Sequence, residues 1–291
     1  MHCHRLLAAA LCLLVSFLAA PAHADPARAA DWSHAVGDIS SGADGEARAL
    51  AITRRLDQLG IAWKAEAFEL DGQRGTNVIA DLGGPIDRPL LLIGAHYDRV
   101  AVGHGATDNA SGSAIVLALA EALKLRGLSR HRVQVAFWDL EEAGLLGARA
   151  WTLTPDRAPP ALYVNFDVFG WGDTLWMMAP TSDDSLAAIM RKQSSTASLL
   201  FRAGEKYPPT DHLAFLRRGW PAVSFSLMGS DEIDSTLAVF EGTKPATMPK
   251  VMRVIHSADD TVEQIDSTHV STALQVLEAG LREWDDPQEM R

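Results

Sequence analysis

The stretch Ile93–Gly112, IGAHYDRVAVGHGATDNASG, decides the fold class of this chain. It continues an apolar run that begins at Leu90 and that is typical of a buried strand. His96 and Asp98 follow at the end of this predicted strand, and Asp108 comes after a glycine-rich loop, just before a helical pattern. Because open α/β sheets bind ligands at the carboxyl ends of their strands, we expect the chemistry of the protein to lie here.

The first 24 residues have the pattern of a secretory signal peptide. Arg5 supplies a positive charge, Leu6–Ala20 is an apolar stretch too short to span a bilayer alone, and Ala22-His23-Ala24 forms a cleavage site. We expect residues 1–24 to be removed and residues 25–291 to form one domain in the periplasm or outside the cell. An uncleaved membrane anchor is the alternative. Cleavage would remove both cysteines, so the mature chain would contain no disulfide.

The acidic balance of the chain argues against nucleic acid and anionic membranes as partners. The formal net charge is −11, and loss of Arg5 with the signal would lower it to −12. No later stretch has the length and apolar character of a membrane span. A hydrophobic content of 47% allows one large core, as in a single α/β domain. The sequence leaves the oligomeric state open.

Predicted strands and helices alternate along the mature chain. Residues 25–40 are expected to be an irregular lead-in, and residues 228–250 a polar loop. This alternation predicts a three-layer α/β/α fold around a central mixed, largely parallel sheet. The apolar periodicities predict strands at residues 62–70, 76–82, 90–95, 133–139, 162–167, 174–178 and 222–227, and helices at residues 42–60, 111–126, 141–151, 184–193, 211–218 and 267–284.

Carboxylates recur where predicted strands end. Glu141 and Glu142 follow one apolar strand, and Asp167 ends another. If one of the two adjacent acids binds a metal, the other is free to act as a general base. Acids at a helix start are equally explained by the helix dipole, so both interpretations stay open at this point.

Three histidines have neighbours that suggest chemistry. His96 and Asp98 are two positions apart, so on a strand they would share a face, and a metal-bound imidazole usually donates its other N–H to a carboxylate. Asp211-His212 is explained equally well by a helix cap. His256 ends a short apolar run, where a lone histidine is more often structural.

The segments that carry these residues follow one another in a specific order. They are His96-Tyr97-Asp98, Gly105–Gly112, Glu141–Gly147, Asp167, Thr210-Asp211-His212 and His256–Thr261. In this order they resemble the M28 family of co-catalytic zinc aminopeptidases. The resemblance covers about residues 42–281, and the order of the motifs is more specific than any one of them.

The resemblance implies a ligand set for two zinc ions. Asp108 would bridge the two ions, because the matching carboxylate does so in the family. His96 and Asp167 would complete one metal site. Glu142 and His256 would complete the other. Imidazole and carboxylate ligands without thiolate suit zinc in an open catalytic site.

The resemblance also implies roles for residues that do not bind metal. Glu141 would be the general base, and Asp98 the partner of His96. Asp211 and His212 are the candidate substrate-binding residues. The peptide bond after Asp108 is expected to be cis. The expected reaction is hydrolysis of the amino-terminal peptide bond of a substrate with a free amino terminus, through a water shared by two metals about 3.5–4 Å apart.

Two features depart from the family pattern, and neither is a ligand position. His104 stands in the loop before Asp108, and Phe169-Gly170-Trp171 after Asp167 is bulky. The sequence does not single out the pocket for the substrate side chain, because core burial explains aromatic residues equally well. The candidate walls are Trp171, Trp176, Phe201, Tyr207, Trp220 and Phe240.

A glutaminyl cyclase, which uses one zinc on the same fold, is the main alternative. Asp211-His212 followed by Phe215–Gly219 is similar to that branch. Against it, Asn109–Gly112 follows the metal-binding aspartate as in aminopeptidases, and Ile255 precedes the last histidine where cyclases carry Trp. A non-enzymatic relative conflicts with the full set of ligands and base. A carboxypeptidase-like reaction would need a cationic pocket for the substrate carboxylate.

Overall fold

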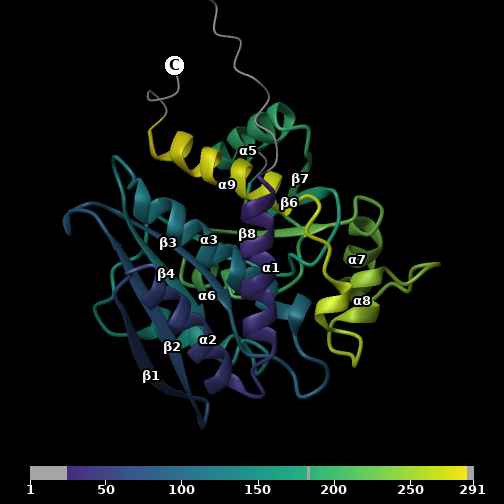
Figure 1. Ribbon diagram of the computed structural model, residues 1–291, viewed down its shortest axis with the longest axis horizontal. Helices are drawn as coiled ribbons and strands as arrows, with labels where there is room; N and C mark the ends of the chain where they lie inside the picture. Colours follow the sequence, from purple (N-terminus) through teal and green to yellow (C-terminus); the bar gives the residue numbers. More distant parts are fainter. Residues whose placement is uncertain (1–24, 182–183, 287–291) are drawn as a thin grey trace, which may run out of the picture.

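The computed structural model describes residues 25–181 and 184–286 of the 291-residue chain, so the predicted signal peptide lies outside the described residues. Within them, eight strands form one sheet in the order β1-β2-β4-β3-β5-β8-β6-β7 (Figure 1). The strands are β1 (Trp63–Leu70), β2 (Gln73–Gly83), β3 (Leu90–His96), β4 (Arg132–Trp138), β5 (Leu162–Phe166), β6 (Thr174–Met178), β7 (Leu200–Gly204) and β8 (Ala222–Met228).

The sheet is parallel at its centre and mixed at its edges. Strands β4, β3, β5 and β8 run parallel to one another. At one edge β2 is antiparallel to both β1 and β4, and at the other β6 is antiparallel to β8 and parallel to β7. Every residue of β3 is buried, as expected for a strand covered on both faces. The predicted α/β fold with a mixed sheet is confirmed.

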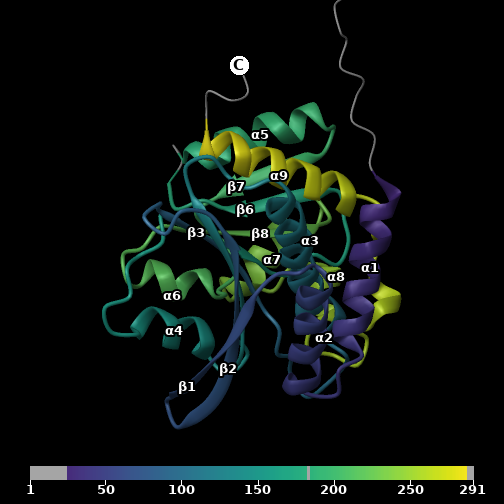
Figure 2. The same cartoon turned by 60° about the vertical axis from the view of Figure 1, so that its left-hand side comes forward.

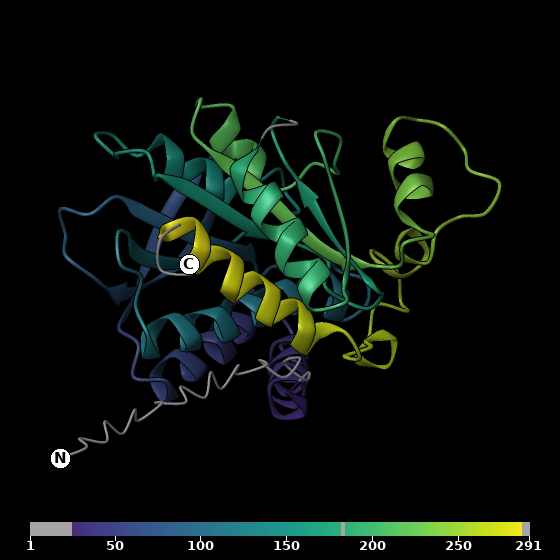
Figure 3. The ribbon, with the colours of Figure 1, turned by 90° about the horizontal axis from the view of Figure 1, so that it is seen from above.

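Helices cover both faces of the sheet (Figure 2). One face carries α1 (Pro26–Ser40), α2 (Gly45–Gln58), α3 (Ser111–Leu125) and α9 (Val270–Asp285), and α5 (Ser185–Thr196) packs beside α9 (Figure 3). The other face carries α4 (Leu146–Leu153) and α6 (His212–Leu216). Helices α7 (Ile233–Phe240) and α8 (Lys250–Val254) lie to one side (Figure 1). In residues 25–181 and 184–286, no helix combines the length and apolarity needed to cross a membrane.

The prediction of an irregular lead-in at residues 25–40 is wrong, because this segment forms α1. Asp25 caps the helix by accepting the N–H of Ala27 at 2.9 Å, and Pro26 occupies the first turn. Trp32, Val36 and Ile39 are buried at helical spacing. The apolar stripe and the cap can both be read from the sequence. The stripe packs α1 against the core of the domain.

The prediction that a helix begins at Glu141 is also wrong, since α4 begins at Leu146. The intervening residues form a turn, with positive φ at Leu140 (57°) and Leu145 (61°). The backbone N–H groups of Glu141 and Glu142 donate to a carboxylate from another part of the chain instead of lying in a first helical turn. A long-range partner therefore overrides the local preference of adjacent acids for a helix start.

Three elements were not predicted from the sequence: strand β7 and the helices α7 and α8. Strand β7 lies at the sheet edge and buries few side chains, so its apolar pattern is weak. Helix α7 lies inside the segment 228–250, which was predicted to be a loop. It buries mainly Ile233 and Thr236, and this narrow face is easily missed among the surrounding polar and glycine residues. The remaining predicted elements are present, with ends displaced by a few residues.

Candidate active site

Five predicted ligands lie together at the carboxyl edge of the parallel strands. His96 ends β3, Glu142 lies in the turn after β4, and Asp167 directly follows β5. Asp108 comes from the short segment η1 (Ala106–Ala110), which joins the loop after β3 to α3. His256 follows α8. Parallel strands end at the same edge of a sheet, which explains why His96, Glu142 and Asp167 meet here.

The five side chains form two groups that share Asp108. In the first group, His96 Nε2 lies 3.2 Å from Asp108 Oδ1 and 3.5 Å from Asp167 Oδ1. In the second, His256 Nε2 lies 3.1 Å from Asp108 Oδ2 and 3.0 Å from Glu142 Oε2. Within each group the potential ligand atoms lie within 4.8 Å of one another. Each carboxylate oxygen of Asp108 thus faces a different group, which is the arrangement a bridging ligand needs.

Asp98 links the first group to the turn after β4. Its Oδ1 accepts the N–H of Glu141 at 3.0 Å, and its Oδ2 accepts the N–H of Glu142 at 3.2 Å. Asp98 Oδ1 also lies 3.3 Å from Nδ1 of His96, on the side of the ring away from the other ligands. One buried carboxylate therefore contacts one imidazole and accepts the backbone N–H groups of two acids.

Asp260 and Asn109 hold the segment that carries Asp108. The Asp260 carboxylate accepts the N–H groups of Thr107 at 2.6 Å and of Asp108 at 3.1 Å. The Asn109 side chain donates to the carbonyl of Phe166 at 2.9 Å, and the Asp108–Asn109 peptide bond is cis, as expected. Sequence reasoning assigned no role to Asp260, although it lies in the same motif as His256.

The electrostatics of the cluster fit a bound cation. Burial alone would lower the pKa of His96, but Glu141 and Asp167 outweigh it and raise this pKa well above its ordinary value. Burial raises the pKa of Glu141 to about 10, and Asp211 and Asp167 add to this effect against the opposing influence of His96. Oδ1 of Asp167 is buried without a hydrogen-bond donor among the described residues. Packed carboxylates of this kind need positive charge, and nitrogen and oxygen donors without thiolate suit zinc.

Asp211 and His212 lie behind the site rather than at its surface. Both are buried, and Thr210 is the residue of this segment that lines the adjoining cavity. Burial raises the pKa of Asp211 well above its ordinary value, and neither of its carboxylate oxygens has a hydrogen-bond donor among the described residues. Burial and Arg217 lower the pKa of His212 to about 3, so its imidazole is neutral near pH 7. Their role in substrate binding stays a prediction.

A cavity of about 300 Å³ opens beside the two groups. Asp108, Glu141, Glu142, Asp167 and His256 line one end of it. Of the aromatic residues considered as pocket walls, those in this cavity are Trp176, Tyr207 and Phe240, whereas Trp171, Phe201 and Trp220 lie outside it. The remaining apolar wall, which sequence reasoning missed, consists of Val168, Pro208, Pro209, Met228, Val251, Met252 and Ile255.

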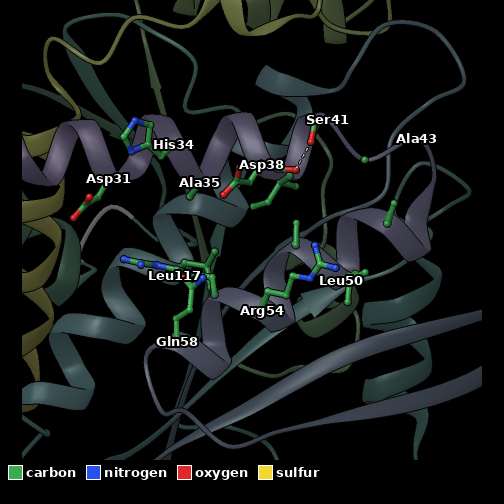
Figure 4. A pocket seen from close by; sticks show the side chains of 15 residues that line it. Asp31, His34, Ala35, Asp38, Ser41, Ala43, Leu50, Arg54, Gln58 and Leu117 are labelled. Carbon is green, nitrogen blue, oxygen red and sulfur yellow. Dashed lines mark hydrogen bonds between the residues drawn. The ribbon is translucent and has the colours of Figure 1, made fainter.

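A larger hollow of about 550 Å³ lies between α1 and α2 (Figure 4). Charged side chains such as Asp31, Asp38 and Arg54 line it. None of its lining residues belongs to the two ligand groups. The cavity beside Asp108 is therefore the one in which the clustered imidazoles and carboxylates can act on a bound molecule.

Several solved structures share the fold of this chain. The LapA aminopeptidase of Legionella pneumophila has a TM-score of 0.70 at 17% identity, covering 88% of this chain and 72% of that chain. The glutaminyl cyclase of Porphyromonas gingivalis has a TM-score of 0.71 at 18% identity, and the likeness covers 88% of this chain and 98% of the cyclase. The zinc aminopeptidase BSAP of Bacillus subtilis has a TM-score of 0.57 at 21% identity, and the likeness covers 74% of this chain and 51% of BSAP. At these identities the likeness concerns the fold.

Residues 77–279 match peptidase family M28, and the chain belongs to this family. It is 36% identical over 124 residues to leupeptin-inactivating enzyme 1 of Streptomyces exfoliatus, covering 41% of this chain and 28% of the relative. It is 30% identical over 160 residues to leucine aminopeptidase 2 of Trichophyton equinum, and this match covers 50% of this chain and 32% of the relative. The matches thus span less than a third of the length of these curated relatives.

Proposed function

We propose that the protein is a zinc-dependent aminopeptidase that hydrolyses the amino-terminal peptide bond of peptides. The observation that carries this proposal is the position of Asp108 between two imidazole–carboxylate groups, with one oxygen facing each. Membership of peptidase family M28 supports the reaction class. A bridging carboxylate between two such groups favours two metal ions rather than one.

The proposed ligands follow from the two groups. Asp108 would be shared by both zinc ions, His96 and Asp167 would hold one of them, and Glu142 and His256 would hold the other. Oδ1 of Asp167 is buried and has no hydrogen-bond donor among the described residues, which supports the assignment of Asp167 as a ligand. When bound, the zinc ions supply Lewis acidity, which polarises the scissile carbonyl and lowers the pKa of water toward about 7.

We assign the proton transfers to Glu141. Its carboxylate lines the cavity beside the ligands, while its own backbone N–H is bound to Asp98. Glu141 therefore lies beside the proposed ligands without belonging to either ligand group. It accepts a proton from the attacking water and delivers it to the leaving amine, as general acid–base catalysis requires. With cations bound beside it, the charged form of the Glu141 carboxylate would be favoured, and that form can accept the proton.

The cavity beside Glu141 accommodates the amino-terminal side chain of the substrate. Trp176, Tyr207 and Phe240 give it an apolar wall, and the ligand groups form its polar end. An apolar side chain is favoured there because its burial removes apolar surface from water. The substrate is therefore a peptide with a free amino terminus and an apolar first residue.

We also propose that the protein is exported. The support is the sequence pattern of residues 1–24, with Arg5, an apolar stretch and a cleavage site after Ala24. Cleavage there would place the mature protein, residues 25–291, in the periplasm or outside the cell.

Glutaminyl cyclization is the second candidate function. The observation that favours it is the likeness to the Porphyromonas gingivalis cyclase, of which this chain covers 98%. The presence of both imidazole–carboxylate groups favours the aminopeptidase, since the cyclase reaction was expected to use a single zinc.

Metal analysis and a substrate panel separate the two functions. Elemental analysis of the purified protein is combined with assays on aminoacyl anilides and on a peptide with amino-terminal glutamine. About two zinc ions per chain with anilide hydrolysis supports the aminopeptidase. About one zinc ion with pyroglutamate formation would replace that proposal by the cyclase.

A further inference from the structure

A fully buried arginine contacts the loop between two proposed ligands. Arg48 lies on α2 and has no solvent exposure. Its Nε donates to the carbonyl of Tyr97, its Nη1 to the carbonyl of His104 at 2.9 Å, and its Nη2 to the carbonyl of Gly105 at 3.1 Å. All three acceptors lie between His96 and Asp108 in the sequence, so the guanidinium spans the loop that joins them.

This use of a buried guanidinium is unusual. Buried arginines normally pair with a carboxylate, because an uncompensated buried charge is costly. Across residues 25–181 and 184–286 the structure records no ion pair between Arg48 and a carboxylate, so backbone carbonyls satisfy it. A planar guanidinium can donate to three acceptors in a fixed geometry, which a lysine cannot reproduce.

The same loop is held from its other side by Asp260. The Asp260 carboxylate accepts the N–H groups of Thr107 and Asp108, and its backbone carbonyl accepts the N–H of His104 at 2.8 Å. Carbonyls of the loop thus point to Arg48, and N–H groups of the loop point to Asp260. Together these two residues fix the path of the chain that leads into the bridging carboxylate.

The packing around Arg48 leaves room for its side chain but for little else. A Cβ atom at Gly42 would lie 2.7 Å from Cγ of Arg48, closer than real contacts allow. The outward sides of α1 and α2 form the hollow in Figure 4, to which Arg54 contributes and Arg48 does not. Helix α2 therefore points Arg48 inward, toward the loop between His96 and Asp108, which we call the ligand loop.

We propose that Arg48 is a positioning residue that fixes the spacing of His96 and Asp108 and thereby sets the affinity of the site for zinc. The inference rests on the proposed function, because it assumes that these two side chains bind zinc. It also extends the metal site to a helix outside residues 77–279, the segment that matches the family. Residues that orient metal ligands commonly change metal affinity by about 10–100-fold when they are replaced.

Arg282 provides a matched control. It is also buried on a helix and donates to two backbone carbonyls, of Ala122 at 3.2 Å and of Gly127 at 3.3 Å. It pairs with Glu278 at 3.0 Å and contacts none of the proposed ligands. Replacing it removes a comparable buried guanidinium from the core without touching the ligand loop.

The test measures the zinc dissociation constant of Arg48→Met, Arg48→Lys and Arg282→Met by competition with a chromogenic chelator, with thermal unfolding of the metal-free proteins as a check of folding. We expect Arg48→Met to bind zinc about 10–100-fold more weakly than the wild type, Arg48→Lys to be intermediate, and Arg282→Met to stay within about twofold. A cobalt-loaded sample adds a second readout, because a changed ligand arrangement alters its visible absorption spectrum.

Each outcome decides the inference. Unchanged zinc affinity in folded Arg48→Met, or an equal loss in Arg282→Met, would overturn it. If Arg48→Met does not fold, Arg48→Lys takes its place, and unchanged affinity and cobalt spectrum in that variant would equally overturn the positioning role. Failure of the wild type to bind zinc would instead refute the proposed function, and this outcome is recognised before any variant is compared.

Discussion

Replacing Asp98 by asparagine tests how the ligands are held. Asp98 accepts the N–H groups of Glu141 and Glu142 with its two oxygens. An asparagine has one oxygen and one NH₂ group, so one of these N–H groups would face a donor and lose its acceptor. A buried unsatisfied donor costs about 1–3 kcal/mol, and loss of the charged acceptor weakens the remaining bond, which gives about 2–4 kcal/mol in total. For a domain of this size that lowers Tm by roughly 5–15 °C.

The same change should weaken metal binding, because Asp98 also lies against Nδ1 of His96. We expect zinc affinity to fall about 10–100-fold, with a parallel loss in kcat/KM on an aminoacyl anilide. Asp285→Asn is the matched control, because Asp285 is a buried carboxylate that accepts backbone N–H groups of Ser129 and His131 far from the ligands. It should lose comparable stability and keep its zinc affinity. Asp98→Asn with zinc affinity within twofold of the wild type would refute this reasoning.

Three further changes test the assigned roles. Glu141→Gln should lower kcat by about 10²–10⁴-fold while both zinc ions stay bound, as an anilide assay and elemental analysis would show; loss of zinc would make Glu141 a ligand instead of the base. Asp108→Ala should lose metal, because neither group keeps its shared carboxylate, and full zinc content in this variant would contradict the bridging role. Removal of zinc with a chelator should abolish hydrolysis, and added zinc should restore it; activity that survives complete removal would argue against a metal-dependent reaction.

Much of the site was predictable because its residues stand at the ends of apolar strands. The pattern around β3 and β5 placed His96 and Asp167 at one edge of the sheet, and the structure brings them together with Asp108. The local state of Glu141 was not predictable. Adjacent acids favour a helix start, but the carboxylate of Asp98, 43 positions away, accepts the N–H of Glu141 and holds a turn.

The walls of the substrate cavity could not be predicted from the sequence either. Nothing local distinguishes Trp176 and Phe240, which line the cavity, from Trp171 and Trp220, which do not. No motif in the sequence marks any of the four, so only the packing of α7 and α8 beside the sheet separates a cavity wall from the core.

The sequence by itself determined the alternation of strands and helices and the acidic net charge, and the order of its motifs, through the resemblance to a family, indicated the proposed ligands. These properties depend on periodicity and short motifs, which are local, and on composition, which does not depend on how the chain folds. The tertiary structure alone decided that Asp108 turns one oxygen to each group and that Arg48 reaches the carbonyls of the ligand loop. The physical reason is that a hydrogen bond between residues some 50 positions apart depends on the paths of two separate segments, and local sequence patterns do not encode the distance between them.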